Sequence, residues 1–190
     1  MNTQIIANIN TFIRKRLIES SGILLIFFSI FLLAVIVSYS PSDPNFIYTP
    51  ESTEIKNVGG FYGSVISDFL LQALGLISIL LVFNFLSWGF KLFKKKTVNN
   101  FTTKIFFVIS YLILGTTVAN VYYNDSFWLI DNGNGGFVGQ TIKENIYYFT
   151  PLIENEYIIY GLGTLTIVFF ILSLSINLKE IIKILFFPLI

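Results

Sequence analysis

The sequence predicts an all-α integral membrane protein whose four transmembrane helices form two parallel repeats of helix, loop, short helix and helix. Three observations support this fold class. Hydrophobic residues make up 54% of the 190 residues and charged residues only 12%, which leaves too few polar side chains to cover a water-soluble domain. Four long apolar runs separate polar segments, and one glycine-rich phrase occurs twice.

The four apolar runs lie at residues 22–39, 69–90, 105–121 and 157–176. A bilayer core about 30 Å thick needs roughly 20 apolar residues at about 1.5 Å each, so each run is long enough to cross it as a helix. Backbone amides find no water in hydrocarbon, and these uninterrupted runs lack the alternation of barrel strands. Each run is therefore predicted to be a transmembrane helix.

The first run has a secretory signal peptide as an alternative interpretation, because it follows the basic residues Arg14, Lys15 and Arg16. However, the run is longer than the usual apolar core of a signal peptide. The residues that follow, Ser38-Tyr39-Ser40-Pro41, are also not a small-x-small cleavage site. The sequence therefore favours a retained membrane anchor.

Basic residues are segregated along the chain, and this predicts the topology. Ten of the twelve lie in residues 1–21, 91–104 and 177–190: the topology-determining residues Arg14, Lys15, Arg16, Lys91, Lys94, Lys95 and Lys96, and in addition Lys104, Lys179 and Lys183. By the positive-inside rule these three segments are cytoplasmic, as the N-terminal segment, the central loop and the tail, and loops 40–68 and 122–156 are external. Residues 22–176 then form one four-helix transmembrane domain with both termini in the cytoplasm.

The repeated phrase supports the division into two units. It contains the structural repeat glycines Gly59, Gly60 and Gly63 in one copy and Gly135, Gly136 and Gly139 in the other, and a helix breaker, Gly75 or Pro151, follows twelve residues later. The intervals 64–74 and 140–150 have the mixed polarity of short helices at a membrane surface. Both units cross in the same direction, so the repeat is parallel. A turn with positive φ or a close backbone approach is favoured over a GxxxG dimer contact.

Residues suited to chemistry are scarce, since the chain contains no cysteine and no histidine. This excludes thiol and imidazole catalysis and the usual haem and copper ligation. The sequence also lacks a GxxxxGK[ST] phosphate-binding loop and a GxSxG nucleophile elbow. No catalytic, cofactor-binding or metal-binding residue is predicted.

Polar and small residues in or near the runs are expected to serve packing. Asn84 is expected to form a hydrogen bond between helices, with a ligand site as the alternative. Asp68 is expected to be a helix-start carboxylate at the interface, with a proton or cation relay in a pore as the alternative. Gly115, Gly161 and Gly163 are expected to let neighbouring helices approach closely.

Two external segments, 40–58 and 122–134, are the candidates for binding a partner. They combine acidic residues with the aromatic residues Phe46, Tyr48, Phe127 and Trp128. Aromatic side chains often anchor protein interfaces, although these rings are equally suited to rest on lipid headgroups.

Several motifs follow one another in a characteristic order. They are the basic triplet at 14–16, SYSPSDP at 38–44, NVGGFYG at 57–63, DFLLQALG at 68–75, Trp88-Gly89 and the second glycine phrase at 135–139. Over about residues 14–179, this order resembles the N-terminal four-span membrane region of the FtsK/SpoIIIE family of DNA translocases.

The resemblance implies a membrane-anchoring and septum-targeting domain in the bacterial inner membrane, with a role in cell division and chromosome segregation. The implied partners are the lipid bilayer, further copies of the chain and other division proteins, and DNA only through the family's motor. ATP and magnesium would bind that motor, whose linker and phosphate-binding loop are missing after Lys183, so no cofactor is expected here. The chain is then a fragment or a separately encoded anchor that acts as a scaffold and not as an enzyme.

A small four-helix channel or transporter, with Asp68 and Asn84 facing its axis, is the alternative function. An intramembrane hydrolase is less favoured, because the spans contain no nucleophile and base that can be paired.

Overall fold

The computed structural model describes residues 2–49, 54–125, 129 and 132–176. This part of the chain is helical and contains no β-strand, so the predicted all-α fold class is confirmed. The elements in chain order are α1 (Asn2–Val37), α2 (Gly60–Leu74), the 3₁₀ helix η1 (Gly75–Ser78), α3 (Ile79–Lys95), α4 (Phe101–Tyr122), α5 (Gly136–Phe149), the 3₁₀ helix η2 (Pro151–Glu154) and α6 (Glu156–Ser173).

Four helical segments are long and apolar enough to cross a membrane, as predicted: Ile6–Val37, Gly60–Lys95, Phe101–Tyr122 and Glu156–Ser173. Only 17 to 33% of the residues in their most apolar windows are buried inside the protein. Rings such as Phe27 and Phe106 are more than half exposed, at 66% and 62%. Apolar surface of this extent is stable when hydrocarbon surrounds it.

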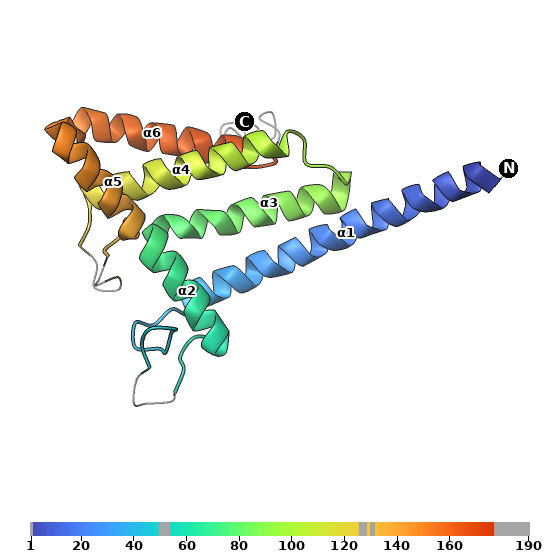
Figure 1. The fold of residues 1–190 in the computed structure, drawn as a ribbon, viewed down its shortest axis with the longest axis horizontal. Coiled ribbons are helices and arrows are strands. Elements are labelled where there is room, and N and C mark those ends of the chain that lie inside the picture. The colour runs from blue at the N-terminus through green and yellow to red at the C-terminus, as the bar shows by residue number, and fades with distance from the viewer. Residues whose placement is uncertain (1, 50–53, 126–128, 130–131, 177–190) are drawn as a thin grey trace, which may run out of the picture.

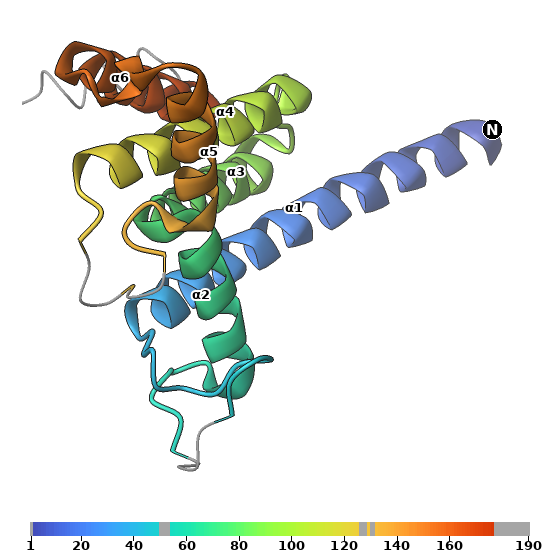
Figure 2. The ribbon, with the colours of Figure 1, turned by 60° about the vertical axis from the view of Figure 1, so that its left-hand side comes forward.

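The long helices α1, α3, α4 and α6 lie side by side, with α3 between α1 and α4 (Figure 1). Within each half of the chain the long helices pack directly, α1 on α3 and α4 on α6. The short helices α2 and α5 cross one end of the bundle, and Figure 2 shows them one above the other. The order long helix, short helix, long helix thus occurs twice, while a repeat of two matching units stays a prediction. We call the end with α2 and α5 the loop end.

Helix α1 is longer than a membrane requires. Its 36 residues extend over about 54 Å at about 1.5 Å per residue, against a bilayer core of about 30 Å. From Asn2 onward, the expected N-terminal segment is therefore continuous with the first span. No proline or glycine occurs between Asn2 and Ser21 to interrupt the backbone hydrogen bonding. The N-terminal part of α1 projects beyond the other helices (Figure 1).

The expected span at 69–90 is divided at Gly75, which separates α2 from η1 and α3. Gly75 has φ +58°, in the left-handed region that favours glycine, and the chain changes direction there (Figure 1). A Cβ at this position would also collide with the carbonyl oxygen of Asn134. In the second half, Pro151 opens η2 directly after α5. The two expected helix breakers therefore follow the two short helices.

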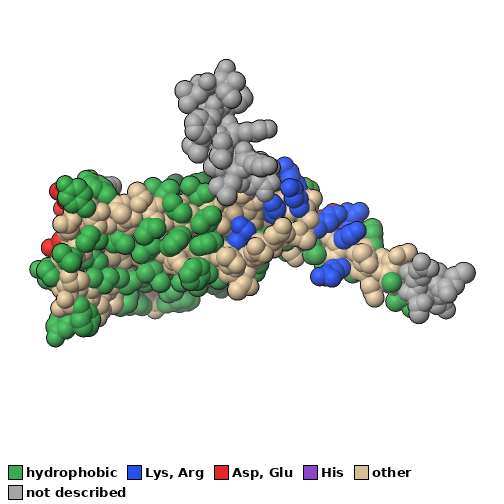
Figure 3. Space-filling model, turned by 90° about the horizontal axis from the view of Figure 1, so that it is seen from above, with side chains coloured by type: hydrophobic (Ala, Val, Ile, Leu, Met, Phe, Trp, Pro, Cys, Tyr) green, Lys and Arg blue, Asp and Glu red, His purple; other side chains and the backbone are tan. Residues whose placement is uncertain are grey.

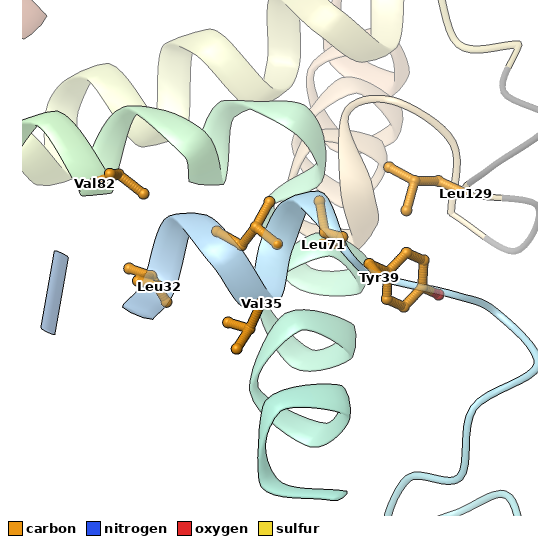
Figure 4. Close-up of a cluster of buried hydrophobic side chains, with 7 residues drawn as sticks. Leu32, Val35, Tyr39, Leu71, Val82 and Leu129 are labelled. Atoms are coloured by element: carbon orange, nitrogen blue, oxygen red, sulfur yellow. The ribbon is translucent and has the colours of Figure 1, made fainter. Parts of the chain in front are cut away.

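The interior combines an apolar cluster with many polar groups. We call the segment between α1 and α2, residues 38–59, the first connection, and the segment between α4 and α5, residues 123–135, the second connection. The apolar cluster lies where α1, α2 and α3 meet the second connection. Its members are Leu32, Val35, Ile36, Tyr39, Leu71, Val82 and Leu129 (Figure 4). Buried polar side chains elsewhere include Ser29, Ser67, Ser78, Asn84, Thr116, Thr117, Asn120 and Ser173. Since lipid tails are as apolar as leucine, membrane helices associate through such polar contacts and through close packing.

Glycines bring α1 and α3 into backbone contact away from the loop end. A Cβ on Gly22 would lie 2.6 Å from the backbone nitrogen of Phe93, and one on Gly89 would lie 2.9 Å from the carbonyl oxygen of Gly22. Only residues without a Cβ allow this separation. Sequence reasoning did not identify this crossing.

The expected close approach holds at Gly115 and fails at the two glycines of α6. A Cβ on Gly115 would lie 3.0 Å from Cγ2 of Thr166, so α4 and α6 are tightly packed there. Among the described residues, a Cβ on Gly161 would meet no atom within 4 Å and one on Gly163 would meet only Val118 at 3.9 Å, so the expectation is wrong for both. Apolar composition alone does not show which side of a helix faces a neighbour.

Candidate functional site

The two glycine phrases begin the two short helices in the same way. The second glycine of each phrase is the first residue of α2 or α5, Gly60 or Gly136. Their φ values are +61° and +64°, a conformation that a Cβ makes unfavourable. Each phrase therefore uses a glycine to turn the chain into a helix.

The first glycine of each phrase lies against the preceding long helix. A Cβ on Gly59 would lie 2.6 Å from Cγ1 of Val35 in α1, and one on Gly135 would lie 2.5 Å from the carbonyl oxygen of Thr116 in α4. The chain thus returns to the long helix that it has just left.

The last glycine of each phrase is packed equally tightly. A Cβ on Gly63 would collide with the side-chain oxygen of Asn57, and one on Gly139 would collide with the carbonyl oxygen of Thr116. Gly59 and Gly63 therefore allow α2 to pack on α1, and Gly135 and Gly139 allow α5 to pack on α4. This is a structural role within one chain.

Asn84 joins three helices through its amide. Its side chain is 1% exposed, donates to the Tyr111 hydroxyl of α4 at 2.8 Å and accepts from the Ser173 hydroxyl of α6 at 2.7 Å. Both ends of the amide are bonded, as burial in apolar surroundings requires. Sequence reasoning singles out Asn84 but does not identify Tyr111, because an aromatic residue in an apolar run gives no indication of what its hydroxyl contacts.

Two further hydrogen bonds join α3 to the end of α6. Trp88 Nε1 donates to the carbonyl oxygen of Ser173 at 2.9 Å, and the backbone N–H of Ser175 donates to the Ser87 hydroxyl at 2.8 Å. Hydrogen bonds from side chains of α3 thus connect the two halves inside the bundle.

Asp68 lies in the middle of α2, which begins eight residues earlier at Gly60. The expectation of a helix-start carboxylate is therefore wrong, because the glycine phrase itself forms the first turn. The two carboxylate oxygens accept from the Tyr39 hydroxyl at 3.2 Å and from Asn45 Nδ2 at 2.8 Å. Asp68 thus anchors the first connection to α2.

Gln72 extends this cluster to the second half of the chain. Its Nε2 donates to the Tyr39 hydroxyl at 3.3 Å, and its Oε1 accepts from Asn132 Nδ2 at 2.7 Å. A pocket of about 530 Å³ lies beside the cluster, with a lining that includes Phe46, Ile47, Tyr48, Asp68, Phe69 and Phe137. We call it the loop-end pocket.

Two buried residues that sequence reasoning did not identify hold the first connection in place. Asp43 is 3% exposed and accepts from the backbone N–H groups of Lys56 at 3.0 Å and Asn57 at 2.8 Å. The Asn57 amide donates to the carbonyl oxygen of Val35 and to the Ser67 hydroxyl. Only the Asp-Pro and Asn-x-Gly pairs, which are typical of turns, could have indicated this network.

The aromatic residues expected at a partner surface are placed in part. Phe46 is 78% and Tyr48 48% exposed, and both border the loop-end pocket. Phe127 and Trp128 lie outside the described residues.

Basic side chains gather towards the end of the bundle away from α2 and α5 (Figure 3). This basic end contains Arg14, Lys15 and Arg16 in α1, Lys91, Lys94 and Lys95 at the end of α3, Lys96 after it, and Lys104 in the second turn of α4. Glu19 pairs with Arg16 at 2.7 Å and also with Lys96. Lys104 donates to the carbonyl oxygens of Leu172 and Leu174. Lys179 and Lys183 lie outside the described residues.

Within the part of the chain that the structure describes, no three acidic, cysteine or histidine side chains are grouped so that they could hold a metal ion. The described residues instead form contacts between helices, hydrogen-bonded connections at the loop end and a basic end.

Residues 14–182 match the family described as the 4TM region of DNA translocase FtsK/SpoIIIE. The match includes nearly all of the four long helices and both connections at the loop end. This chain belongs to that family. The glycine phrases, Asn84 with its contacts and the basic end all lie inside the matched residues.

Curated relatives named DNA translocase FtsK also match the chain. The chain is 28% identical to the one from Shewanella oneidensis over 145 residues, which is 73% of this chain and 16% of the relative. It is 31% identical to the Azospirillum brasilense protein over 90 residues, 47% of this chain and 14% of the relative. It is 24% identical to the Mesorhizobium japonicum protein over 110 residues, 58% of this chain and 12% of the relative.

The chain thus matches only 12 to 16% of the length of these relatives. No solved structure matches it significantly.

Proposed function

We propose that this chain is the membrane-anchoring and septum-targeting domain of an FtsK-type DNA translocase, active in cell division and chromosome segregation. The observation that carries the proposal is the family match over residues 14–182, which includes α1 from residue 14 onward and all of α3, α4 and α6. In this proposal the chain acts as a scaffold without catalysis. ATP, magnesium and DNA would bind to a motor outside these 190 residues.

The proposed location is the bacterial inner membrane with both termini in the cytoplasm. The segregation of charge supports this orientation. In the segments expected in the cytoplasm, every basic residue that the structure describes lies at the basic end. The loop end would then face outward, together with α2, α5 and the loop-end pocket.

Assembly with other copies and with division proteins would use the loop end. Phe46, Ile47 and Phe69 are 70% or more exposed there. They lie around Asp68 and Gln72, which the hydrogen-bond network holds in fixed positions. Exposed aromatic residues on an ordered polar base are typical of interface anchors.

The alternative of a channel or transporter finds less support. It places Asp68 and Asn84 on a common axis, but Asn84 is 1% exposed and bonded at both ends of its amide. Both oxygens of Asp68 accept hydrogen bonds from residues of the first connection.

The proposal is tested by fusing a fluorescent protein to the chain and imaging dividing bacterial cells that carry a second label on the division ring. We expect the fusion to concentrate at the septum, and a Phe46→Ala, Phe69→Ala variant to stay in the membrane but lose most of this enrichment. A matched control is Phe27→Ala, Phe106→Ala, which alters two rings exposed along the spans. Uniform membrane fluorescence of the unaltered chain would contradict septum targeting.

A further inference from the structure

An apolar groove lies between α3 and the end of α6, near the basic end. It has a volume of about 490 Å³, and its walls include Leu80, Phe83, Leu86 and Phe90 of α3 and Phe170 and Leu174 of the α6 side. The halves of the chain meet here through separate side-chain contacts, which leaves an opening between them.

One rim of this groove is basic. Lys91, Lys94 and Lys95 line it directly beyond Phe90. Their spacing of three and four residues puts them on one side of α3, where the apolar wall ends. A single continuous surface is therefore apolar along the span and positively charged where α3 ends.

These three lysines have no ion-pair partner among the described residues. Among the described residues, the acid at this end is Glu19, which pairs with Arg16 and Lys96. Lys104 is also engaged, because it donates to carbonyl oxygens at the end of α6. The positive charge along the groove is therefore uncompensated by the described part of the chain.

A buried hydroxyl points to the same ligand class. Ser175 is 8% exposed, and its Oγ lacks a hydrogen-bond partner among the described residues. Ser175 lines the groove and also a smaller pocket of about 250 Å³ that includes Lys91 and Lys104. Buried polar groups are normally hydrogen-bonded, so an unpaired hydroxyl between lysines indicates a missing acceptor.

We propose that this groove binds one anionic phospholipid from the leaflet at the basic end. The phosphate lies among Lys91, Lys94 and Lys95 and accepts a hydrogen bond from Ser175, while one acyl chain lies along Phe83, Phe90 and Phe170. A soluble anion would contact only the basic rim, and an apolar peptide would contact only the apolar walls. A phospholipid contacts both, the rim with its phosphate and the walls with its acyl chain. Because α3 is part of a membrane span, lipids also surround the groove. The inference does not depend on septum targeting.

The test uses the full chain purified in a neutral detergent, with native mass spectrometry to count bound lipids at about physiological ionic strength. We expect phosphatidylglycerol to bind in a one-to-one ratio and more tightly than phosphatidylcholine. The triple variant Lys91→Gln, Lys94→Gln, Lys95→Gln is expected to weaken phosphatidylglycerol binding about 100-fold, from about fivefold for each lysine. The variant Ser175→Ala is expected to weaken it about fivefold, and it removes no contact within the described chain.

The matched control is Arg14→Gln, Lys15→Gln, Arg16→Gln, which removes the same charge from α1 at the same end of the bundle. We expect at most about a twofold change, because none of these three residues lines the groove and Arg16 is already paired with Glu19. An equal loss in both triple variants would reduce the effect to general attraction and overturn the site. Equal affinity of the unaltered chain for both lipids would also overturn the site. So would a lysine triple variant that binds lipid as before but no longer forms dimers, because the groove would then hold a second copy of the chain.

Discussion

The two halves of the chain use the same glycine turn with different surroundings. Gly60 and Gly136 both begin a short helix with φ near +60°, at +61° and +64°. A Cβ on Gly60 would meet no atom of the described residues within 4 Å, whereas one on Gly136 would lie 2.5 Å from the backbone nitrogen of Gly75. Gly60 therefore only turns the chain, whereas Gly136 also packs one half of the chain against the other.

The remaining glycines of the two phrases differ in the atoms that they pack against. In the first half, Gly59 and Gly63 face the side chains of Val35 and Asn57, while in the second half Gly139 faces backbone. The backbone N–H of Leu76 also donates to the carbonyl oxygen of Asn134 at 3.0 Å, beside the second phrase. The same glycine phrase thus makes different contacts in the two halves of the chain. Substitutions can measure how much each copy contributes to the free energy of unfolding.

The largest difference is expected between Gly136→Ala and Gly60→Ala. The positive φ costs each variant about 1–2 kcal/mol. Gly136→Ala also forces a methyl group against the end of α2, which adds about 1–3 kcal/mol. Reversible unfolding of the chain in mixed micelles measures both free energies. Equal losses would mean that the second phrase does not join the halves.

A smaller difference is expected between Asn84→Ala, which acts between the halves, and Ser29→Ala, which acts inside the first. Loss of the Asn84 amide removes two bonds between helices and leaves the Tyr111 and Ser173 hydroxyls short of a partner, at about 1–2 kcal/mol. The Ser29 hydroxyl donates to the Val82 carbonyl, and its loss is expected to cost about 0.6 kcal/mol. The same unfolding measurement applies, and a larger loss for Ser29→Ala would reverse this ranking.

The smallest difference is expected between Gln72→Ala and Gln140→Ala. Gln72 connects Tyr39 to Asn132 across the two connections, so its loss is expected to cost about 0.5–1 kcal/mol. Gln140 bonds only to Glu144 one turn away on the exposed side of α5, and its loss is expected to be near zero. Protease resistance of the loop end provides a second readout. Identical behaviour of the two variants would show that the Gln72 bridge contributes nothing.

Hydropathy was sufficient to predict the four spans, because each crossing needs a long apolar helix whatever it packs against. Glycine and proline were sufficient to predict where α2 and α5 end, since Gly75 and Pro151 act through their own backbone restrictions. These properties are local, so a single sequence shows them.

The contacts between elements could not be predicted in this way. The crossing at Gly22 and Gly89, the partners of Asn84 and the network of Asp43 depend on which helix faces which. In a chain exposed to lipid, apolar residues cover both the inner and the outer side of a helix, so hydropathy carries little information about facing. Gly161 illustrates this, because it lies in an apolar run as Gly115 does, and yet a Cβ on it would meet no described atom within 4 Å.

The most direct test of the central claim, that both glycine phrases lie on one side of the membrane and the lysines on the other, is cysteine accessibility. The chain has no native cysteine, so single substitutions report without interference. Tyr62→Cys and Tyr148→Cys lie at exposed positions of α2 and α5, and Asn99→Cys lies at an exposed position between α3 and α4. In intact spheroplasts, a membrane-impermeant maleimide should label the first two and should label Asn99→Cys only after permeabilisation. Labelling of Asn99→Cys in intact spheroplasts, with the other two protected, would contradict the account.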